Sequence, residues 1–146
     1  MLIFRTISPN EHSYVQSFYD SVGYDRKIQP TDKVIIAETD KNIIATARIA
    51  FENEHYVLRG MQVAKVYQRK NIGTQILFNI ANVIDNHECY CIPYSWLEKF
   101  YEKINFKKIP EELAPYFLQD RIKQYRKKGY DLIIMKREKI LAKNYN

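Results

Sequence analysis

A short cationic turn contains the residues of this sequence that are best suited to bind an anion. The turn, Gln68-Arg69-Lys70-Asn71-Ile72-Gly73, follows a run of alternating apolar residues that ends at Val63. It precedes residues 76–84, whose apolar members recur at helical spacing, so it joins a strand to the start of a helix. The first backbone N–H groups of a helix have no intrahelical partner, and the helix dipole adds to their attraction for anions. We therefore predict a phosphate-binding turn.

The turn matches no general phosphate-binding motif. It contains one glycine, Gly73, and Asn71 stands where a positive φ is expected, which Asn tolerates better than most residues. It lacks the later Lys-Ser/Thr of the nucleotide P-loop and the three glycines of the dinucleotide fingerprint. An ordinary surface turn between a strand and a helix is the alternative interpretation.

From Val63 through Leu77 the sequence resembles the coenzyme A binding motif of the GNAT superfamily of N-acyltransferases, Gln/Arg-x-x-Gly-x-Gly/Ala, with Asn71 in place of the middle glycine. The resemblance implies that backbone amides of residues 69–74 hold the pyrophosphate of acetyl-CoA, while the strand ending at Val63 pairs with the pantetheine arm. The cofactor-binding residues that it implies are Met61, Gln62, Val63, Gln68, Arg69, Lys70, Asn71, Ile72, Gly73 and Thr74. We call residues 68–74 the cofactor turn.

A second segment, Phe100-Tyr101-Glu102-Lys103-Ile104-Asn105-Phe106, is similar to the GNAT stretch Tyr-Glu-Lys-x-Gly-Phe, with Asn105 for the glycine. The resemblance implies that Tyr101 lies near the thioester sulfur and acts as a general acid, a role that suits a phenol because it remains protonated at neutral pH. A tyrosine hydrogen-bonded in the core is the alternative. Together the two segments predict direct transfer of an acetyl group from acetyl-CoA to a primary amine in a ternary complex.

The general base and the acceptor are less well marked. No carboxylate stands where a direct base is obvious, so we expect a base that acts through water; the polar residues near or on the cofactor strand are Glu52, Glu54, His55, Arg59 and Gln62. Arg59 could hold an acceptor carboxylate or form a plain salt bridge. The predicted acceptor-binding residues are Tyr24, Arg59 and Tyr94.

The order of elements predicts a mixed α/β fold with a largely antiparallel central sheet and helices on both faces, as in the GNAT acyl-CoA N-acyltransferases. Strands are expected over residues 2–7, 33–39, 43–51, 56–63, 87–92 and 132–135, and helices after Ser8, behind the cofactor turn, from Ser95 to Ile104 and over 116–128. Residues 136–146 read as a frayed polar end. With 146 residues, we expect residues 1–146 to form one domain.

The two cysteines, Cys89 and Cys91, are two residues apart in an expected strand and so share one face, where they are poorly placed for a disulfide. No second pair completes a zinc site, and no metal is predicted. The N-terminus lacks a signal peptide's apolar core, and no apolar run reaches membrane-spanning length. A reducing cytoplasm is expected, without a membrane partner.

The net charge of +6 is concentrated near the C-terminus, where residues 121–146 contain nine Lys/Arg against two acidic residues. This leaves an alternative function open, in which a non-catalytic basic module binds nucleic acid or an acidic partner through residues 121–139. Because regular aromatic interleaving is lacking, we expect a solvated basic face instead of a nucleic-acid site. A ligand sensor that binds acyl-CoA without turnover is a third possibility, and a homodimer through the last strand is a further expectation.

Overall fold

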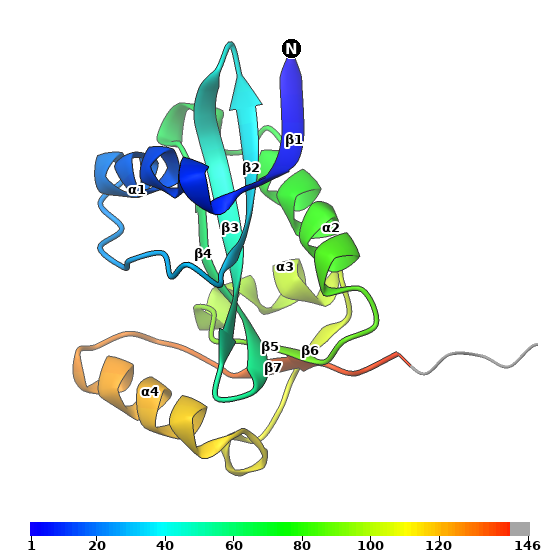
Figure 1. Ribbon diagram of the computed structural model, residues 1–146. Coiled ribbons are helices and arrows are strands. Elements are labelled where there is room, and N and C mark those ends of the chain that lie inside the picture. The colour runs from blue at the N-terminus through cyan, green and yellow to red at the C-terminus, as the bar shows by residue number, and fades with distance from the viewer. Residues whose placement is uncertain (141–146) are drawn as a thin grey trace, which may run out of the picture.

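A seven-stranded sheet forms the centre of the molecule in the computed structural model, which describes residues 1–140 (Figure 1). The strand order is β1-β2-β3-β4-β5-β7-β6, and only the β4–β5 pair is parallel. The strands are β1 (Leu2–Ile7), β2 (Lys33–Thr39), β3 (Asn42–Glu52), β4 (His55–Val63), β5 (Cys89–Cys91), β6 (Phe106–Lys108) and β7 (Met135–Arg137). The helices are α1 (His12–Ser21), α2 (Ile72–Ile84), α3 (Glu98–Glu102) and α4 (Tyr116–Lys127), with 3-10 turns η1 (Pro9–Glu11), η2 (Lys65–Tyr67), η3 (Ser95–Leu97) and η4 (Glu111–Leu113).

Helices cover both faces of the sheet, which confirms the predicted fold class (Figure 1). On one face, α2 and α3 pack their apolar residues on the large core cluster that contains Leu58, Ile76 and Tyr101. On the other face, α1 and α4 cover two smaller clusters, one around Val15 and one around Leu118. Adjacent residues of a strand point to opposite faces, so Val57 and Leu58 belong to different clusters. Within residues 1–140 no helix is long and apolar enough to cross a bilayer.

The long antiparallel strands β2, β3 and β4 follow one another through two tight turns. Asp40 and Lys41 adopt φ of 50° and 65°, and Asn53 and Glu54 adopt 47° and 66°. Two consecutive positive φ angles give the turn twist that matches antiparallel strands. The β2–β3 hairpin that the sequence predicts is therefore confirmed, and the expected turn before β4 makes a second one.

Strand β4 separates from β5 after a short stretch of pairing. The two strands pair only over Tyr56–Leu58 of β4, whereas the rest of β4 continues to pair with β3. The β3–β4 register shifts between Thr46 and Arg48, which marks a bulge at Gly60, where φ is +66°. The hydroxyl of Tyr19 in α1 donates a hydrogen bond to the Gly60 carbonyl oxygen over 2.8 Å. A glycine inside the strand pattern of residues 56–63 is typical of a bulge, and the structure has one at Gly60, tied by this hydrogen bond to α1.

The last part of the sheet differs from the prediction. The final strand runs over Met135–Arg137 instead of 132–135, and it pairs with both β5 and β6, a strand that the sequence did not predict. Residues 136 and 137 are therefore not frayed: Arg137 is buried and donates to the carbonyl oxygens of Ile104 (2.9 Å) and Asp85 (2.7 Å). Residues 138–140 form no helix or strand and are exposed, and residues 141–146 lie outside the described part of the chain. Since β7 is paired on both sides, its backbone is not free to pair with a second copy.

Two serines that were expected to begin helices do not cap them, and one expected helix and one expected strand are shorter than predicted. The Ser8 side chain contacts Asn10 instead of capping a helix, and the Ser95 hydroxyl donates to Asp131 over 2.6 Å. The expected helix 95–104 is a 3-10 turn followed by the five residues of α3, and the expected strand 87–92 is reduced to β5. Both cysteines of β5 are buried free thiols, as predicted.

The basic residues near the C-terminus do not form the solvated face that the sequence suggested. Arg121 pairs with Glu52, Arg126 with Glu111, and Lys136 with Glu88 and Glu138, and Arg137 is buried. About half of the basic side chains between residues 121 and 139 therefore hold the fold together, which leaves fewer for an anionic partner.

Replacing Gly60 tests the bulge. A Cβ atom at Gly60 would lie 2.3 Å from the Tyr19 hydroxyl oxygen, at a φ that L-residues rarely adopt. We expect Gly60→Ala to reduce the free energy of unfolding by about 2–3 kcal/mol, from the left-handed backbone and the lost hydrogen bond. Gly23→Ala is the control, because φ is +76° but no atom lies within 4 Å, so only the backbone cost remains. Urea unfolding measures both losses, and equal losses would contradict a role for the Tyr19 contact.

Candidate active site

A cavity of about 400 Å³ lies where β4 and β5 separate. Residues 57–62 of β4 form one side, and residues 91–94 at the end of β5 form the other. The remaining walls come from residues 22–26, which follow α1, from η3 and α3, and from α4 with the segment behind it. Side chains on one strand alternate between faces, so the gap receives residues from both faces of the sheet.

The cavity thereby joins the two sides of the molecule. Leu58 and Tyr101 belong to the core cluster under α2 and α3. Val57 and Tyr125 belong to the cluster under α4, and both also line the cavity. A donor bound on one side and an acceptor bound on the other would therefore meet in the gap between the strands.

The cofactor turn adopts a conformation suited to anion binding. Asn71 is the N-cap of α2 in the left-handed region, with φ 66° and ψ 12°, and Arg69 has φ 63°. The Gln68 side-chain amide donates to the carbonyl oxygen of Val63 over 3.1 Å, which ties the start of the turn to the end of β4. Asn71 therefore takes the shape that a glycine would, and the first amides of α2 point out of the helix end. The exposed side chains of Arg69 and Lys70 add positive charge there.

The two sequence motifs are in contact. The Lys103 ammonium donates to the Thr74 hydroxyl over 3.1 Å, and the Phe100 ring lies 3.7 Å from the position of a Cβ on Gly73. Asn105, the second replaced glycine, also has a positive φ, of 72°. The structure thus brings together the cofactor turn, Met61–Val63 at the end of β4 and the α3 motif, with Met61 and Gln62 lining the cavity.

Tyr101 projects from α3 into the cavity and is buried. Its burial raises the pKa of the phenol, with smaller contributions from Cys91 and Tyr24. Among the residues that the structure describes, its hydroxyl has no hydrogen-bond partner. The alternative interpretation, a core tyrosine hydrogen-bonded to the protein, therefore lacks a partner for that bond.

The three predicted acceptor residues, Tyr24, Arg59 and Tyr94, all line the cavity. Tyr94 stacks on Trp96 with ring centroids 4.6 Å apart, and Tyr24 packs against Tyr19 at 4.6 Å. Tyr19 itself is fully buried and does not line the cavity, because its hydroxyl bonds the Gly60 bulge. It holds α1 to the sheet.

The polar residues considered as bases do not gather in the cavity. His55 lies between Tyr90 and Phe117, 3.8 Å from Glu88, and is not part of the lining, and Glu54 is exposed in a turn. Burial raises the pKa of Glu52, but the hydrogen bond and charge of Arg121, and then those of Arg59, outweigh it and hold the pKa below its ordinary value. A general base at neutral pH needs the opposite shift, so Glu52 is a poor base.

Segments 24–32 and 110–130 were expected to supply the pocket walls, but the sequence did not single out the side chains that line the cavity from them: Asp25, Arg26, Arg121, Tyr125 and Tyr130. Arg121 and Tyr125 are four residues apart and therefore share one face of α4. That spacing was visible in the sequence, but residue type alone did not show which face of the helix would meet the cavity. The Arg26 guanidinium lies 5.0 Å from the centre of the Tyr125 ring, which joins the loop after α1 to α4.

Comparison with family models identifies an acetyltransferase (GNAT) domain over residues 30–108, just over half of the chain. The chain belongs to the GNAT acetyltransferase family. As a member of this family it uses an acyl-CoA donor and an acceptor substrate. A comparison with curated proteins finds no match.

Solved structures with this fold cover nearly the whole chain. Escherichia coli ElaA is 15% identical over 94% of this chain and 100% of its own, with a TM-score of 0.67. The ribosomal-protein-S18-alanine N-acetyltransferase of Escherichia coli is 12% identical over 100% and 99%, also with a TM-score of 0.67. N-acetylglutamate synthase from Neisseria gonorrhoeae, solved with coenzyme A and N-acetyl-glutamate, is 17% identical over 97% of this chain and 36% of its own, at 0.65. At these identities the likeness shows the fold alone.

Substitutions at Asn71 test whether the shape of the cofactor turn matters for coenzyme A. A β-branched residue disfavours the left-handed region by about 1–2 kcal/mol, so Asn71→Val should weaken coenzyme A binding by about tenfold. Asn71→Gly should bind as tightly as the native protein. Calorimetric titration with coenzyme A measures each affinity.

Asn105→Val is the matched control, because it strains a turn with nearly the same φ. It should lower stability to a similar extent while leaving coenzyme A affinity unchanged. Equal weakening in both valine variants would mean that the effect comes from general destabilisation.

Proposed function

We propose that this protein is an N-acetyltransferase that moves an acetyl group from acetyl-CoA to a primary amine by direct attack in a ternary complex. The observation that carries the proposal is the cavity between β4 and β5, which has Met61, Gln62 and Tyr101 in its wall. The left-handed cofactor turn follows the end of β4, next to this cavity strand. Acetyl-CoA would place its pyrophosphate on the amides of residues 69–74 and its pantetheine arm along Met61–Val63.

Direct transfer requires the protein to place the amine in line with the thioester, to allow removal of the amine proton and to stabilise the leaving thiolate. The amine nitrogen attacks the thioester carbonyl carbon, a C–N bond forms and the C–S bond breaks with its electron pair going to sulfur. The proton lost by nitrogen ends on that sulfur. Atoms and charges then balance as an amide and free coenzyme A.

Tyr101 would assist the departure of the thiolate. A thiol has a pKa of about 8.5, well below the pKa of a buried phenol. Complete transfer of the Tyr101 proton to the thiolate is therefore unfavourable unless the phenol receives another proton in exchange. We infer that Tyr101 donates a hydrogen bond to the sulfur and passes on a proton that the amine supplies. The raised pKa of Tyr101 suits this role, because burial keeps the phenol protonated at neutral and moderately basic pH.

Removal of the amine proton would occur through water. Of the described residues that line the cavity, Asp25 has the only carboxylate, and it is exposed at the rim. Water in the gap between β4 and β5 can carry the proton from the attacking nitrogen to Tyr101 as Tyr101 passes its own proton to the sulfur, without a protein base in contact with the amine.

Calorimetry with acetyl-CoA and with coenzyme A tests the donor. We expect binding of both at submillimolar concentration or below, and an acetyl-CoA consumption assay over a panel of amines then tests for turnover. Absence of cofactor binding would contradict the proposal. Cofactor binding without turnover on any amine would instead favour a ligand sensor.

The substitution Tyr101→Phe tests the role of the phenol. We expect turnover to fall by at least about 100-fold, the lower range for a positioned proton donor, with coenzyme A affinity nearly unchanged. Stability should also be nearly unchanged, because the hydroxyl bonds no described residue. Steady-state kinetics, calorimetry and thermal unfolding measure the three quantities, and unaltered turnover would remove Tyr101 from the mechanism.

A further inference from the structure

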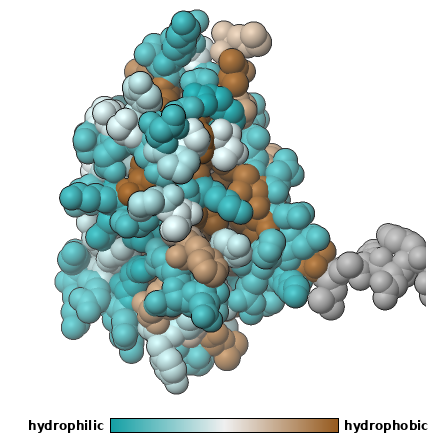
Figure 2. Space-filling view, in the orientation of Figure 1, coloured by the Kyte–Doolittle hydropathy of each residue, from teal (hydrophilic) through white to brown (hydrophobic). Residues whose placement is uncertain are grey.

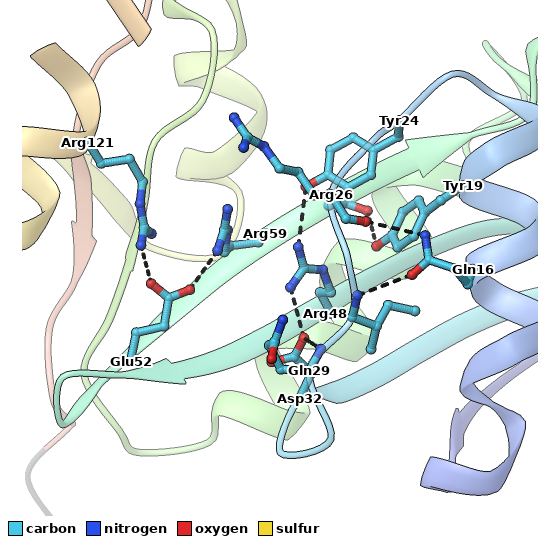
Figure 3. A network of polar contacts seen from close by, with 12 residues as sticks. Gln16, Tyr19, Tyr24, Arg26, Gln29, Asp32, Arg48, Glu52, Arg59 and Arg121 are labelled. Carbon is cyan, nitrogen blue, oxygen red and sulfur yellow. Dashed lines mark hydrogen bonds and ion pairs between the residues drawn. The ribbon is translucent and has the colours of Figure 1, made fainter. Parts of the chain in front are cut away.

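Two arginines from distant parts of the chain meet at the wall of the cavity. Arg59 of β4 donates to one oxygen of Glu52 over 2.7 Å, and Arg121 of α4 donates to the other (Figure 3). Both arginines line the cavity, whereas Glu52 lies behind them at the end of β3. Two guanidinium groups thus share one carboxylate, which leaves one positive charge uncompensated.

The hydrogen-bonding capacity of the pair is also not exhausted. The Nη1 atom of Arg121 is buried and has no hydrogen-bond partner among the described residues. Arg59 bonds Glu52 through Nη1 alone. A buried guanidinium N–H without an acceptor costs free energy. The side chains of Arg59 and Arg121 are 21% and 23% exposed, so their remaining N–H groups are open to a ligand oxygen in the cavity.

The other charges of the cavity do not cancel this excess. Arg26 lies on the same side, stacked over Tyr125, and Asp25 is the one acidic residue of the described lining. With Arg26 and Asp25 offsetting each other, the cavity and its Glu52 support have a net charge of about +1. A polycationic acceptor such as a polyamine would be repelled, whereas a single carboxylate would neutralise the site.

We propose that the acceptor is a small primary amine that also carries a carboxylate group, and that Arg121 and Arg59 bind that carboxylate. This inference rests on the proposed function and names its substrate class. Arginine presents N–H groups in a planar fork that matches the two oxygens of a carboxylate. A phosphate dianion would overcompensate the charge, so a carboxylate fits the site better.

The same placement helps the chemistry. With its carboxylate held at the α4 side of the cavity, the amine end of the acceptor is directed toward the gap between β4 and β5, where the thioester would lie.

Product-like ligands test the proposal for the whole class of acceptors at once. Saturation-transfer NMR on the protein saturated with coenzyme A would compare a pool of N-acetyl amino acids having neutral side chains with the matching pool of their amides. We expect at least one acid to bind, and its affinity to fall by about tenfold or more on amidation. An amide that binds as tightly as its acid, or no acid binding up to about 10 mM, overturns the proposal.

Variants then assign the carboxylate to the arginines. Arg121→Gln and Arg59→Gln should each weaken binding of the acid by about tenfold and leave binding of the amide unchanged. Arg5→Gln is the control, because Arg5 also joins two carboxylates, Glu11 and Glu38, but lies outside the cavity. If the acid binds both glutamine variants as tightly as the control, these arginines do not recognise it.

The outcome is separable from that of the proposed function. Coenzyme A binding is measured by calorimetry on the same samples, and its loss would contradict the donor assignment. The comparison of acid with amide can be repeated without coenzyme A. The preference for a carboxylate is then tested independently of coenzyme A binding.

Discussion

The site depends on a buried ion pair between Arg48 of β3 and Asp32, just before β2. The two side chains are almost completely excluded from solvent, and the Arg48 Nη1 and Asp32 Oδ2 atoms are 2.8 Å apart. Removing one member of such a pair leaves an uncompensated buried charge, which costs about 3–5 kcal/mol. The pair therefore has a fixed position in the core and can fix the position of the segments that contact it.

Two parts of the cavity wall contact this ion pair: the bulge of β4 and the loop after α1. Arg48 lies opposite Arg59 in the β3–β4 register, and its Nε is 3.1 Å from the position of a Cβ on Gly60, so Arg48 packs closely against the glycine bulge. Asp32 accepts the backbone N–H of Gln29 over 2.8 Å, and Arg48 reaches the Tyr24 hydroxyl at 3.5 Å (Figure 3). The bulge that turns β4 and the loop that forms one wall are thus set by the same two side chains. The face of the molecule in Figure 2 is mostly hydrophilic, with hydrophobic side chains in separate patches.

Local patterns were enough to predict the central part of the fold. Apolar runs rich in β-branched residues located β2 and β3, and the strand-turn-helix order located β4 and the cofactor turn. The three-residue strands β6 and β7 were missed or misplaced because they are too short for a periodic pattern. Arg137 reads as a surface residue in the sequence, and its burial depends on carbonyl oxygens 33 and 52 positions away. No local rule contains that information.

The residues proposed to bind the acceptor were also only partly predictable from the sequence. Arg59 was a candidate because it lies on the strand that carries the motif, but its partner Arg121 joins Glu52 across 69 positions of sequence. The sequence placed Arg121 in a basic run and suggested a solvated face. The fold instead uses this charge in the cavity wall, so the excess of basic residues counted from composition overstates the charge that is open to a partner.

The loss of two motif glycines follows from how this chain builds its turns. Eight described non-glycine residues have a positive φ, and five of them are Asn or Asp, whereas the sequence has only four glycines. Asn and Asp accept the left-handed region because their short polar side chains bond locally. Compared with glycine they also restrict the unfolded chain, which favours the folded turn. Asn71 and Asn105 therefore belong to a pattern that runs through the whole chain, in which the shape of a glycine turn is kept while fewer unfolded conformations compete with it.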